Sequence, residues 1–166
     1  MTLVLIDLQE RLVPAMLDGD RMVDAARKLL TGSGLLGRPA FATEQSPDKL
    51  GGTVAALPLP SPAIAKTAFD ASPLIVERTA PGGTLVVAGC ETHICVLQTV
   101  AGLLKAGRKV VVAADAVSSR KALDRDTALA GMRAMGAQIS TVEAILFGWI
   151  GGAEHPQFRA FSRLIK

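Results

Sequence analysis

The sequence predicts an α/β protein with three layers, in which a doubly wound sheet of six mainly parallel strands lies between two layers of helices. Three observations predict this fold class. Short apolar runs such as "LVLIDL" (3–8) are typical of strands covered on both faces. Helical segments separate these runs, so strand and helix alternate along the chain. A length of 166 residues suits one domain, 1–166, with a sizeable core.

The first half of the chain predicts three strands and two helices. Residues 3–8 form a strand that ends at Asp7. After Pro14, residues 18–34 form a helix, because apolar residues recur at helical spacing before the closing glycines. Residues 38–45 and 63–69 read as strands, and the Pro/Gly-rich segment 46–62 as a loop with one helical turn at most. Residues 72–80 form a short helix with Ser72 as its cap.

The second half continues the alternation. Residues 83–90 form the most strand-like segment, and a helix follows from Thr92 to Lys105, closed by Gly107. Residues 108–117 form the fifth strand and 124–136 a helix. Residues 137–146 begin as a sixth strand and become helical, and 155–166 form a final amphipathic helix.

Composition excludes several classes of protein. With 49% hydrophobic and 20% charged residues, the chain is not disordered. The net charge is +3, the basic residues are scattered, and there is no tyrosine, which argues against a nucleic-acid partner. The N-terminal apolar run is broken at Asp7, so it predicts neither a signal peptide nor a membrane span. We expect a protein of the cytoplasm that does not bind membranes.

No metal or cofactor is expected. Two cysteines and two histidines fit neither a disulfide framework nor a zinc site, and His93 and His155 lie far apart. The segment "AGCETH" (88–93), which follows a predicted strand, lacks the phosphate-binding pattern GxGxxG of dinucleotide folds, and GxxxxGK[ST] is absent from the chain.

Reactive side chains follow the predicted strands. In a parallel sheet, ligands bind beyond the carboxyl ends of the strands. Asp7 ends the first strand, Glu44 and Gln45 the second, Lys66 lies near the end of the third, and Cys90 ends the fourth. A carboxylate, an amine and a thiol are therefore predicted to meet at one edge of the sheet.

Cys95 is the expected nucleophile. It lies in the first turn of a helix, where free backbone N–H groups and the helix dipole favour a thiolate. Lys66 is expected to lower the pKa of the thiol further, and Asp7 to accept its proton. The same N–H groups suit an oxyanion. Cys90 ends a buried strand and is expected to pack as a small apolar group.

Each of these residues also has a purely structural interpretation. An isolated buried cysteine is more often inert, an aspartate at a strand end more often a turn residue, and a lone lysine more often a surface charge. Lys66 is unusual because it lies in "AIAKTAF", an otherwise apolar strand, and therefore needs an anionic partner or a lowered pKa. His93 is expected to face solvent rather than to act as a base, and Trp149 and Phe69 to be core or subunit-contact residues rather than to stack on substrate.

The chain resembles the isochorismatase-like cysteine hydrolases, a superfamily that includes nicotinamidase and N-carbamoylsarcosine amidohydrolase. The likeness rests on "LIDLQ" (5–9), "KTAF" (66–69) and "GCETHICV" (89–96) and covers nearly the whole chain. The isochorismatase domain-containing branch is the most similar, through "TEQSPDKLGGTV" (43–54), "DAVSSRKALDRDTALAGM" (115–132) and "HPQF" (155–158).

The resemblance implies an isochorismatase-like fold and a catalytic triad of Asp7, Lys66 and Cys95, in which Cys95 forms a thioester. It also implies a cis peptide bond between Cys90 and Glu91, which turns the backbone N–H groups of Glu91 and Cys95 toward an oxyanion. Retention of Cys95 favours hydrolysis of C–N bonds, and the absence of histidine from "TEQSP" (43–47) disfavours a metal-assisted route. Further residues are expected to contact the substrate: Gln9, Glu44, Gln45, Phe69, Thr92 and Ile94.

The leading hypothesis is a metal-independent cysteine hydrolase that cleaves a small amide-type substrate. One alternative is a non-catalytic oligomeric interaction module that docks through its aromatic C-terminal segment, 148–166. Others are an isochorismatase-type hydrolase of a different small substrate and a redox sensor that uses Cys90 and Cys95. A homo-oligomer, a dimer or larger, is expected by analogy with the family and from the apolar C-terminal segment.

Overall fold

The computed structural model describes residues 1–166 and contains one six-stranded sheet and seven α-helices. The strands are β1 (Thr2–Ile6), β2 (Ala40–Gln45), β3 (Ile64–Lys66), β4 (Thr84–Cys90), β5 (Lys109–Ser118) and β6 (Gln138–Ser140). The α-helices are α1 (Gly19–Leu35), α2 (Pro47–Leu50), α3 (Ser72–Arg78), α4 (Leu97–Lys105), α5 (Ala122–Ala134), α6 (Val142–Ile150) and α7 (Phe158–Ile165). A 3₁₀ turn, η1 (Val13–Ala15), and a π-helical turn, η2 (Thr92–Val96), complete the fold.

All strand pairs in the sheet are parallel, and the strand order is β3-β2-β1-β4-β5-β6. This is the doubly wound, Rossmann-like order, in which the chain reverses direction across the sheet between β1 and β4. The predicted α/β fold with a six-stranded sheet is therefore confirmed. Ligands of such folds bind at the point of reversal, beyond the carboxyl ends of the two central strands.

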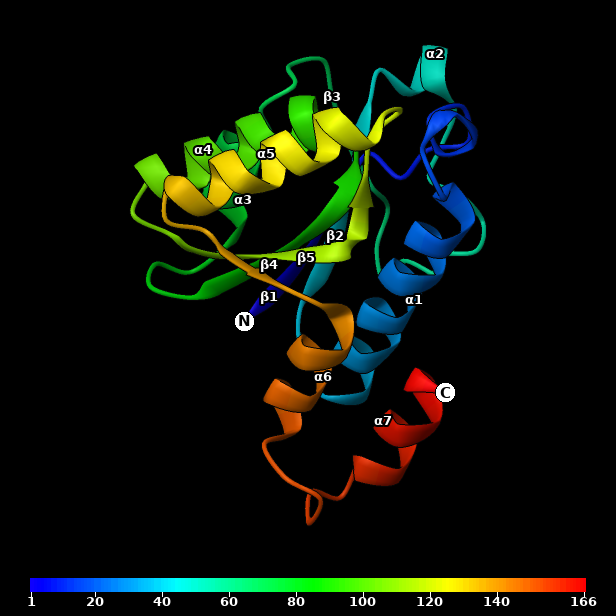
Figure 1. The fold of residues 1–166 in the computed structure, drawn as a ribbon, viewed down its shortest axis with the longest axis vertical. Coiled ribbons are helices and arrows are strands. Elements are labelled where there is room, and N and C mark those ends of the chain that lie inside the picture. Colours follow the sequence, from blue (N-terminus) through cyan, green and yellow to red (C-terminus); the bar gives the residue numbers. More distant parts are fainter.

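Helices cover both faces of the sheet (Figure 1). α3, α4 and α5 pack side by side on one face, and α1, α6 and α7 on the other. The alternation along β1 explains this arrangement, because Leu3 and Leu5 belong to the core cluster under α1 while Val4 and Ile6 belong to the cluster under α3 and α4. A strand buried on both faces needs this continuous apolar run.

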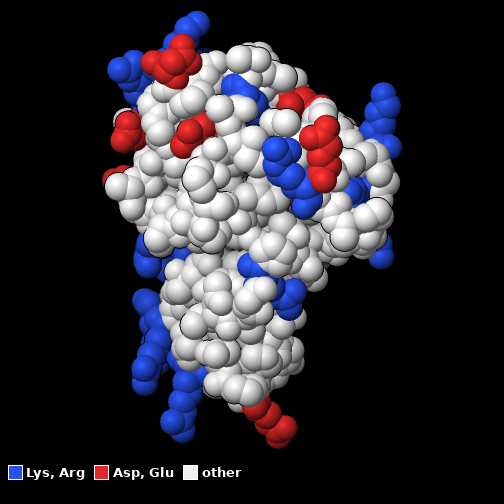
Figure 2. Space-filling view, turned by 180° about the vertical axis from the view of Figure 1, so that it is seen from behind, with Lys and Arg blue, Asp and Glu red and all other residues white.

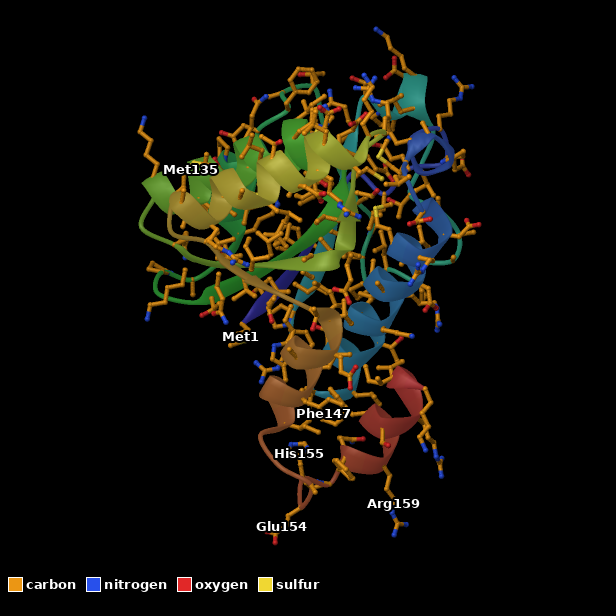
Figure 3. All side chains as sticks on the ribbon, viewed as in Figure 1. Met1, Met135, Phe147, Glu154, His155 and Arg159 are labelled. Atoms are coloured by element: carbon orange, nitrogen blue, oxygen red, sulfur yellow. The ribbon has the colours of Figure 1, made fainter.

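The C-terminal helices extend the layer that contains α1. Phe161 of α7 is fully buried against this core, and the rings of Phe147 and Phe158 lie 6.3 Å apart across the turn between α6 and α7. Figure 3 shows this turn, with His155 and Glu154 at its tip. Trp149 is half-buried and packs against this core beneath the guanidinium of Arg38. None of the helices combines the length and the apolar character that crossing a bilayer requires.

The helix predicted from Thr92 to Lys105 has these bounds, but its first turn is the π-helical turn η2 and the α-helix starts at Leu97. One local prediction was wrong. Ser72 does not cap α3, because the carboxylate of Asp70 accepts the hydrogen bond from the Ser72 backbone N–H (2.7 Å). Figure 2 shows Lys and Arg on several parts of one face, beside Asp and Glu in the upper half and along the edge formed by α7.

Candidate active site

Asp7 and Lys66 form a buried ion pair at the carboxyl end of the sheet. Lys66 Nζ lies 2.7 Å from Asp7 Oδ2, and the exposed fractions of the two side chains are 2% and 0%. Asp7 follows β1 and Lys66 ends β3, which lies two strands away, so the fold brings together residues 59 positions apart. The prediction that Lys66 has an anionic partner is confirmed.

The other oxygen of the Asp7 carboxylate also has a partner. Thr43 of β2 donates its hydroxyl hydrogen bond to Asp7 Oδ1 at 2.7 Å, and both residues are fully buried. The backbone of Asp7 has a φ of +53°, which aspartate tolerates better than most residues because its short side chain makes local hydrogen bonds. Sequence reasoning missed Thr43, although the alternation of polar Thr43 and Gln45 along one face of the strand was a usable signal.

The ammonium group of Lys66 has a complete set of partners. Besides Asp7, it donates to Gln45 Oε1 (2.8 Å) and to the backbone carbonyl of Ala68 (3.1 Å). An ammonium group has three N–H donors, so none is left for bulk water. Lys66 is therefore a fixed buried cation rather than a surface charge.

Cys95 lies beside this pair. Its exposed fraction is 4%. The pKa of its thiol is raised to about 12, because burial and then the negative charge of Asp7 raise it and together outweigh the positive charge of Lys66, which lowers it. The predicted lowering of the Cys95 pKa was wrong, because desolvation and the carboxylate together outweigh the lysine. At neutral pH, Cys95 is a thiol that faces a carboxylate.

Cys90 packs in the core, as predicted. It is fully buried within the cluster under α1, and burial, with the nearby Asp7 charge, raises the pKa of its thiol. Both cysteines are free thiols.

The turn between β4 and η2 adopts an unusual backbone. Glu91 has φ +54° and ψ +64°, in the left-handed region. The peptide bond between Cys90 and Glu91 is trans, so the expected cis bond was wrong. The carbonyl of Glu91 accepts from the N–H groups of Ile94 (2.9 Å) and Val96 (3.4 Å), whereas the N–H of Glu91 donates to no acceptor in the protein. One backbone donor is therefore free near Cys95.

Gly89 allows this turn to approach β1. Its φ is +151°, which residues with side chains rarely adopt, and an added Cβ would lie 2.2 Å from the backbone carbonyl oxygen of Ile6. The pairing of β4 with β5 also shifts register between Val87 and Gly89. Close contact of the two central strands brings the turn after β4 next to Asp7.

Charged side chains tie the turn to the loop after β5. Arg120 Nε lies 3.0 Å from Glu91 Oε1, and the buried Glu91 Oε2 accepts no hydrogen bond. His93 Nδ1 lies 3.0 Å from the Ser119 hydroxyl and 3.5 Å from Glu91 Oε2. His93 is thus half-buried and paired, rather than facing solvent as predicted. Sequence reasoning did not single out Arg120 or Ser119, because their approach to the turn depends on how the loop after β5 folds.

The residues expected to contact substrate occupy different environments. Gln9 donates both amide N–H groups to backbone carbonyls, of Gln45 (3.1 Å) and Gly51 (2.7 Å), so it holds the 45–51 segment. Glu44 accepts hydrogen bonds at 2.7 Å from both the N–H and the hydroxyl of Thr53. The amide of Gln45 is occupied by Lys66 and by the carbonyl of Thr67.

The other three expected contacts differ in exposure. Thr92 is fully buried, and its hydroxyl has no hydrogen-bond partner. Ile94 is half-buried and packs against the core under α3 and α4, while Phe69 is 50% exposed. Phe69 is therefore not a core residue, and only it among the six projects freely from the surface.

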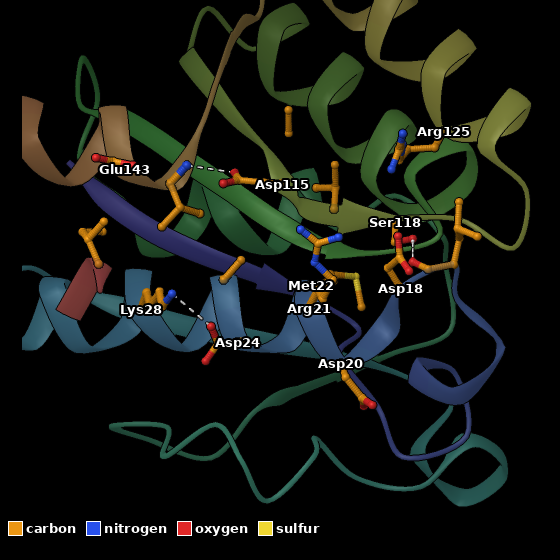
Figure 4. A pocket seen from close by; sticks show the side chains of 16 residues that line it. Asp18, Asp20, Arg21, Met22, Asp24, Lys28, Asp115, Ser118, Arg125 and Glu143 are labelled. Atoms are coloured by element: carbon orange, nitrogen blue, oxygen red, sulfur yellow. Dashed lines mark hydrogen bonds and ion pairs between the residues drawn. The ribbon is translucent and has the colours of Figure 1, made fainter. Parts of the chain in front are cut away.

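A cavity of about 550 Å³ lies away from this cluster (Figure 4). It lies between α1 and β5, with Arg21 and Asp115 on opposite walls and the Asp24–Lys28 ion pair along one side. Neither this cavity nor a second one, between β5, β6 and α5, is lined by Asp7, Lys66 or Cys95. No group of three or more His, Cys, Asp or Glu side chains lies close enough together to hold a metal ion.

Comparison with known proteins identifies the family. The isochorismatase domain model matches residues 1–144. Isochorismatase domain-containing protein 1 of Salmo salar is 36% identical over 166 residues, which cover 96% of this chain but only 59% of that protein.

Two solved structures extend this comparison. The MAR1 ribonuclease of Caenorhabditis elegans superposes with a TM-score of 0.94 at 36% identity, covering 99% of this chain and 88% of that one. The YcaC gene product of Escherichia coli, described as an octameric hydrolase of unknown specificity, has a TM-score of 0.75 at 20% identity, with coverages of 99% and 91%. The match to the family model and the identity to the salmon protein lead to one conclusion: the chain belongs to the isochorismatase domain family.

Proposed function

We propose that residues 1–166 form one metal-independent cysteine hydrolase domain that cleaves the C–N bond of a small amide through a thioester on Cys95. The observation that carries the proposal is the buried Asp7–Lys66 pair beside Cys95, whose thiol pKa the Asp7 charge raises. A neutral thiol next to a fixed carboxylate is a nucleophile with its base in position.

The first half-reaction forms the thioester. Cys95 Sγ attacks the carbonyl carbon as Asp7 takes the thiol proton, and the carbonyl oxygen becomes an oxyanion. The free N–H of Glu91 suits this oxyanion, and we assign the second donor to the N–H of Cys95. When the C–N bond breaks, the leaving nitrogen takes the proton from Asp7 and departs as an amine.

The second half-reaction restores the enzyme. Asp7 accepts a proton from water as the water oxygen attacks the thioester carbon. The C–S bond then breaks, the sulfur regains the proton from Asp7, and a carboxylic acid leaves. Lys66 holds the carboxylate in place throughout, because its three donors stay paired.

Limited access to the sulfur supports a small substrate. Cys95 is 4% exposed, so a narrow acyl or carbamoyl group reaches its sulfur more easily than a bulky one. A cytoplasmic location is part of the proposal, because a free thiol nucleophile must stay reduced.

The test uses an acyl donor and a substrate panel. Wild type and Cys95→Ala are mixed with p-nitrophenyl acetate, and the acetyl group on the protein is located by peptide mass spectrometry. Both proteins are then assayed with primary amides, N-carbamoyl amino acids and RNA. RNA is included because the C. elegans relative is named a ribonuclease. We expect acetyl on Cys95 and turnover of a small amide by wild type only. Turnover that survives Cys95→Ala would exclude the mechanism.

A non-catalytic oligomeric module is the second candidate function. It is favoured by exposed large apolar side chains, above all Leu123 with an exposed fraction of 76%, and by the octamer described for the E. coli protein. Light scattering of Leu123→Lys beside wild type tests the association. A stable oligomer that acylates on no cysteine would favour the module over the enzyme.

A further inference from the structure

Strand β2 touches both charged members of the proposed triad. Thr43 donates to Asp7 Oδ1 at 2.7 Å, and Gln45 accepts from Lys66 Nζ at 2.8 Å. Residues two positions apart on a strand point to the same face, so one rigid element reaches both groups. β2 lies between β1 and β3, the strands that end next to Asp7 and at Lys66.

Gln45 is itself held at several points. Its backbone N–H donates to Gln9 Oε1 (2.7 Å), its carbonyl accepts from Gln9 Nε2 (3.1 Å), and its side-chain N–H donates to the carbonyl of Thr67 (2.7 Å). These bonds orient the amide so that its oxygen, not its nitrogen, faces the Lys66 ammonium.

The Thr43 hydroxyl has a single donor hydrogen, and this hydrogen is committed to Asp7. It therefore fixes the rotation of the carboxylate. With Thr43 on Oδ1 and Lys66 on Oδ2, the carboxylate plane is set, and its remaining lone pairs are directed by the protein and not by solvent.

We propose that Thr43 and Gln45 are positioning residues of this site: Thr43 holds the Asp7 carboxylate in the orientation that receives the Cys95 proton, and Gln45 holds the Lys66 ammonium against it. Neither residue has a donor or acceptor role toward substrate. The inference rests on the proposed function, since it assigns these contacts to acylation of Cys95.

The test measures acylation of Cys95 by p-nitrophenyl acetate in stopped flow, from the burst of p-nitrophenolate. Thr43→Val removes the hydroxyl at nearly constant volume, and Thr43→Ser restores it. Gln45→Leu removes the acceptor for Lys66. Ser33→Ala is the matched control, because it deletes another buried hydroxyl hydrogen bond (3.1 Å to the Arg38 carbonyl) at the far end of α1.

We expect Thr43→Val and Gln45→Leu to lower the limiting acylation rate by about 10- to 100-fold, the size of effect that a small misplacement of a reacting group produces. The half-saturating reagent concentration should stay unchanged, because neither side chain touches the reagent. Thr43→Ser should recover most of the rate, and Ser33→Ala should lose stability to urea but keep the rate.

The Asp7→Asn variant separates the proposed function from the positioning inference. If Asp7→Asn acylates as fast as wild type, the proposed base is wrong. If Asp7→Asn is slow while Thr43→Val matches wild type, only the positioning inference is overturned. Equal loss in Thr43→Val and Thr43→Ser also overturns it. Thr43→Ala repeats the test if the valine variant does not fold, and failure of both to fold would assign Thr43 to stability alone and reject the inference.

Discussion

The buried ion pair makes Lys66→Met the most informative single substitution. Methionine has nearly the length of lysine but no charge, so the change removes the ammonium and leaves little cavity. Asp7, with an exposed fraction of 0%, then keeps the Thr43 hydroxyl but has no cationic partner. Removing one partner of a buried pair costs about 3–5 kcal/mol, because the other charge is left uncompensated. For a chain of this size, the melting temperature should fall by roughly 6–20 °C.

The assay is urea unfolding at neutral pH, followed by circular dichroism, with a double-mutant cycle. Asp7→Asn combined with Lys66→Met should be more stable than Lys66→Met alone, since the orphaned charge is gone. Arg27→Met is the control, because the exposed Arg27–Asp24 pair, with side chains 43% and 46% exposed, should contribute no more than about 1 kcal/mol.

A stability deficit of Lys66→Met below about 1 kcal/mol at neutral pH, equal to that of Arg27→Met, would mean that the pair is not buried in solution and would refute the reasoning.

Three further predictions follow from the same geometry. Because burial and Asp7 raise the pKa of Cys95 to about 12, iodoacetamide labelling of the native protein should accelerate about tenfold per pH unit from pH 7 to 11; a plateau below pH 9 would contradict this. The Cys95 thiol ionises near its ordinary pKa of 9.0 in the unfolded protein but near pH 12 in the folded one. The free energy of unfolding should therefore fall as the pH rises from 9 to 12, and urea unfolding of Cys95→Ala should show a smaller fall. Gly89→Ala should cost about 3 kcal/mol or more through backbone strain and its clash with Ile6, whereas Gly131→Ala, which meets nothing within 4 Å in α5, should stabilise by about 0.5–1 kcal/mol; similar urea midpoints for the two would exclude the close approach.

The sequence predicts the fold well because its signals are local. Uninterrupted apolar runs mark strands covered on both faces, and glycines mark where the helices end. Lys66 stood out for a physical reason, since a cation inside the apolar run "AIAKTAF" requires an anion, and the parallel topology leaves the end of β1 as the place where that anion lies.

Features that depend on the balance between several long-range interactions could not be predicted from the sequence. The direction of the Cys95 pKa depends on whether desolvation and Asp7 outweigh Lys66 and the helix terminus, and no spacing rule gives those weights. The π-helical turn after Glu91 shares the local pattern of an α-helix. The Glu91–Arg120 contact depends on how the loop after β5 folds back, 29 residues along the chain.

Charge balance explains why a protonated thiol suits this site better than the thiolate predicted from sequence. At rest, the three groups of the proposed triad are the Asp7 carboxylate, the Lys66 ammonium and a neutral thiol, so their net charge is zero. A resting thiolate would bury one unpaired negative charge, which a 4%-exposed sulfur cannot share with water. If Asp7 takes the proton during attack, the carboxyl group becomes neutral as the oxyanion forms, and Lys66 still balances a single negative charge. Under the proposed mechanism, the net charge of the triad and the reacting group stays at zero in every step. No step therefore buries an additional unpaired charge in the closed site.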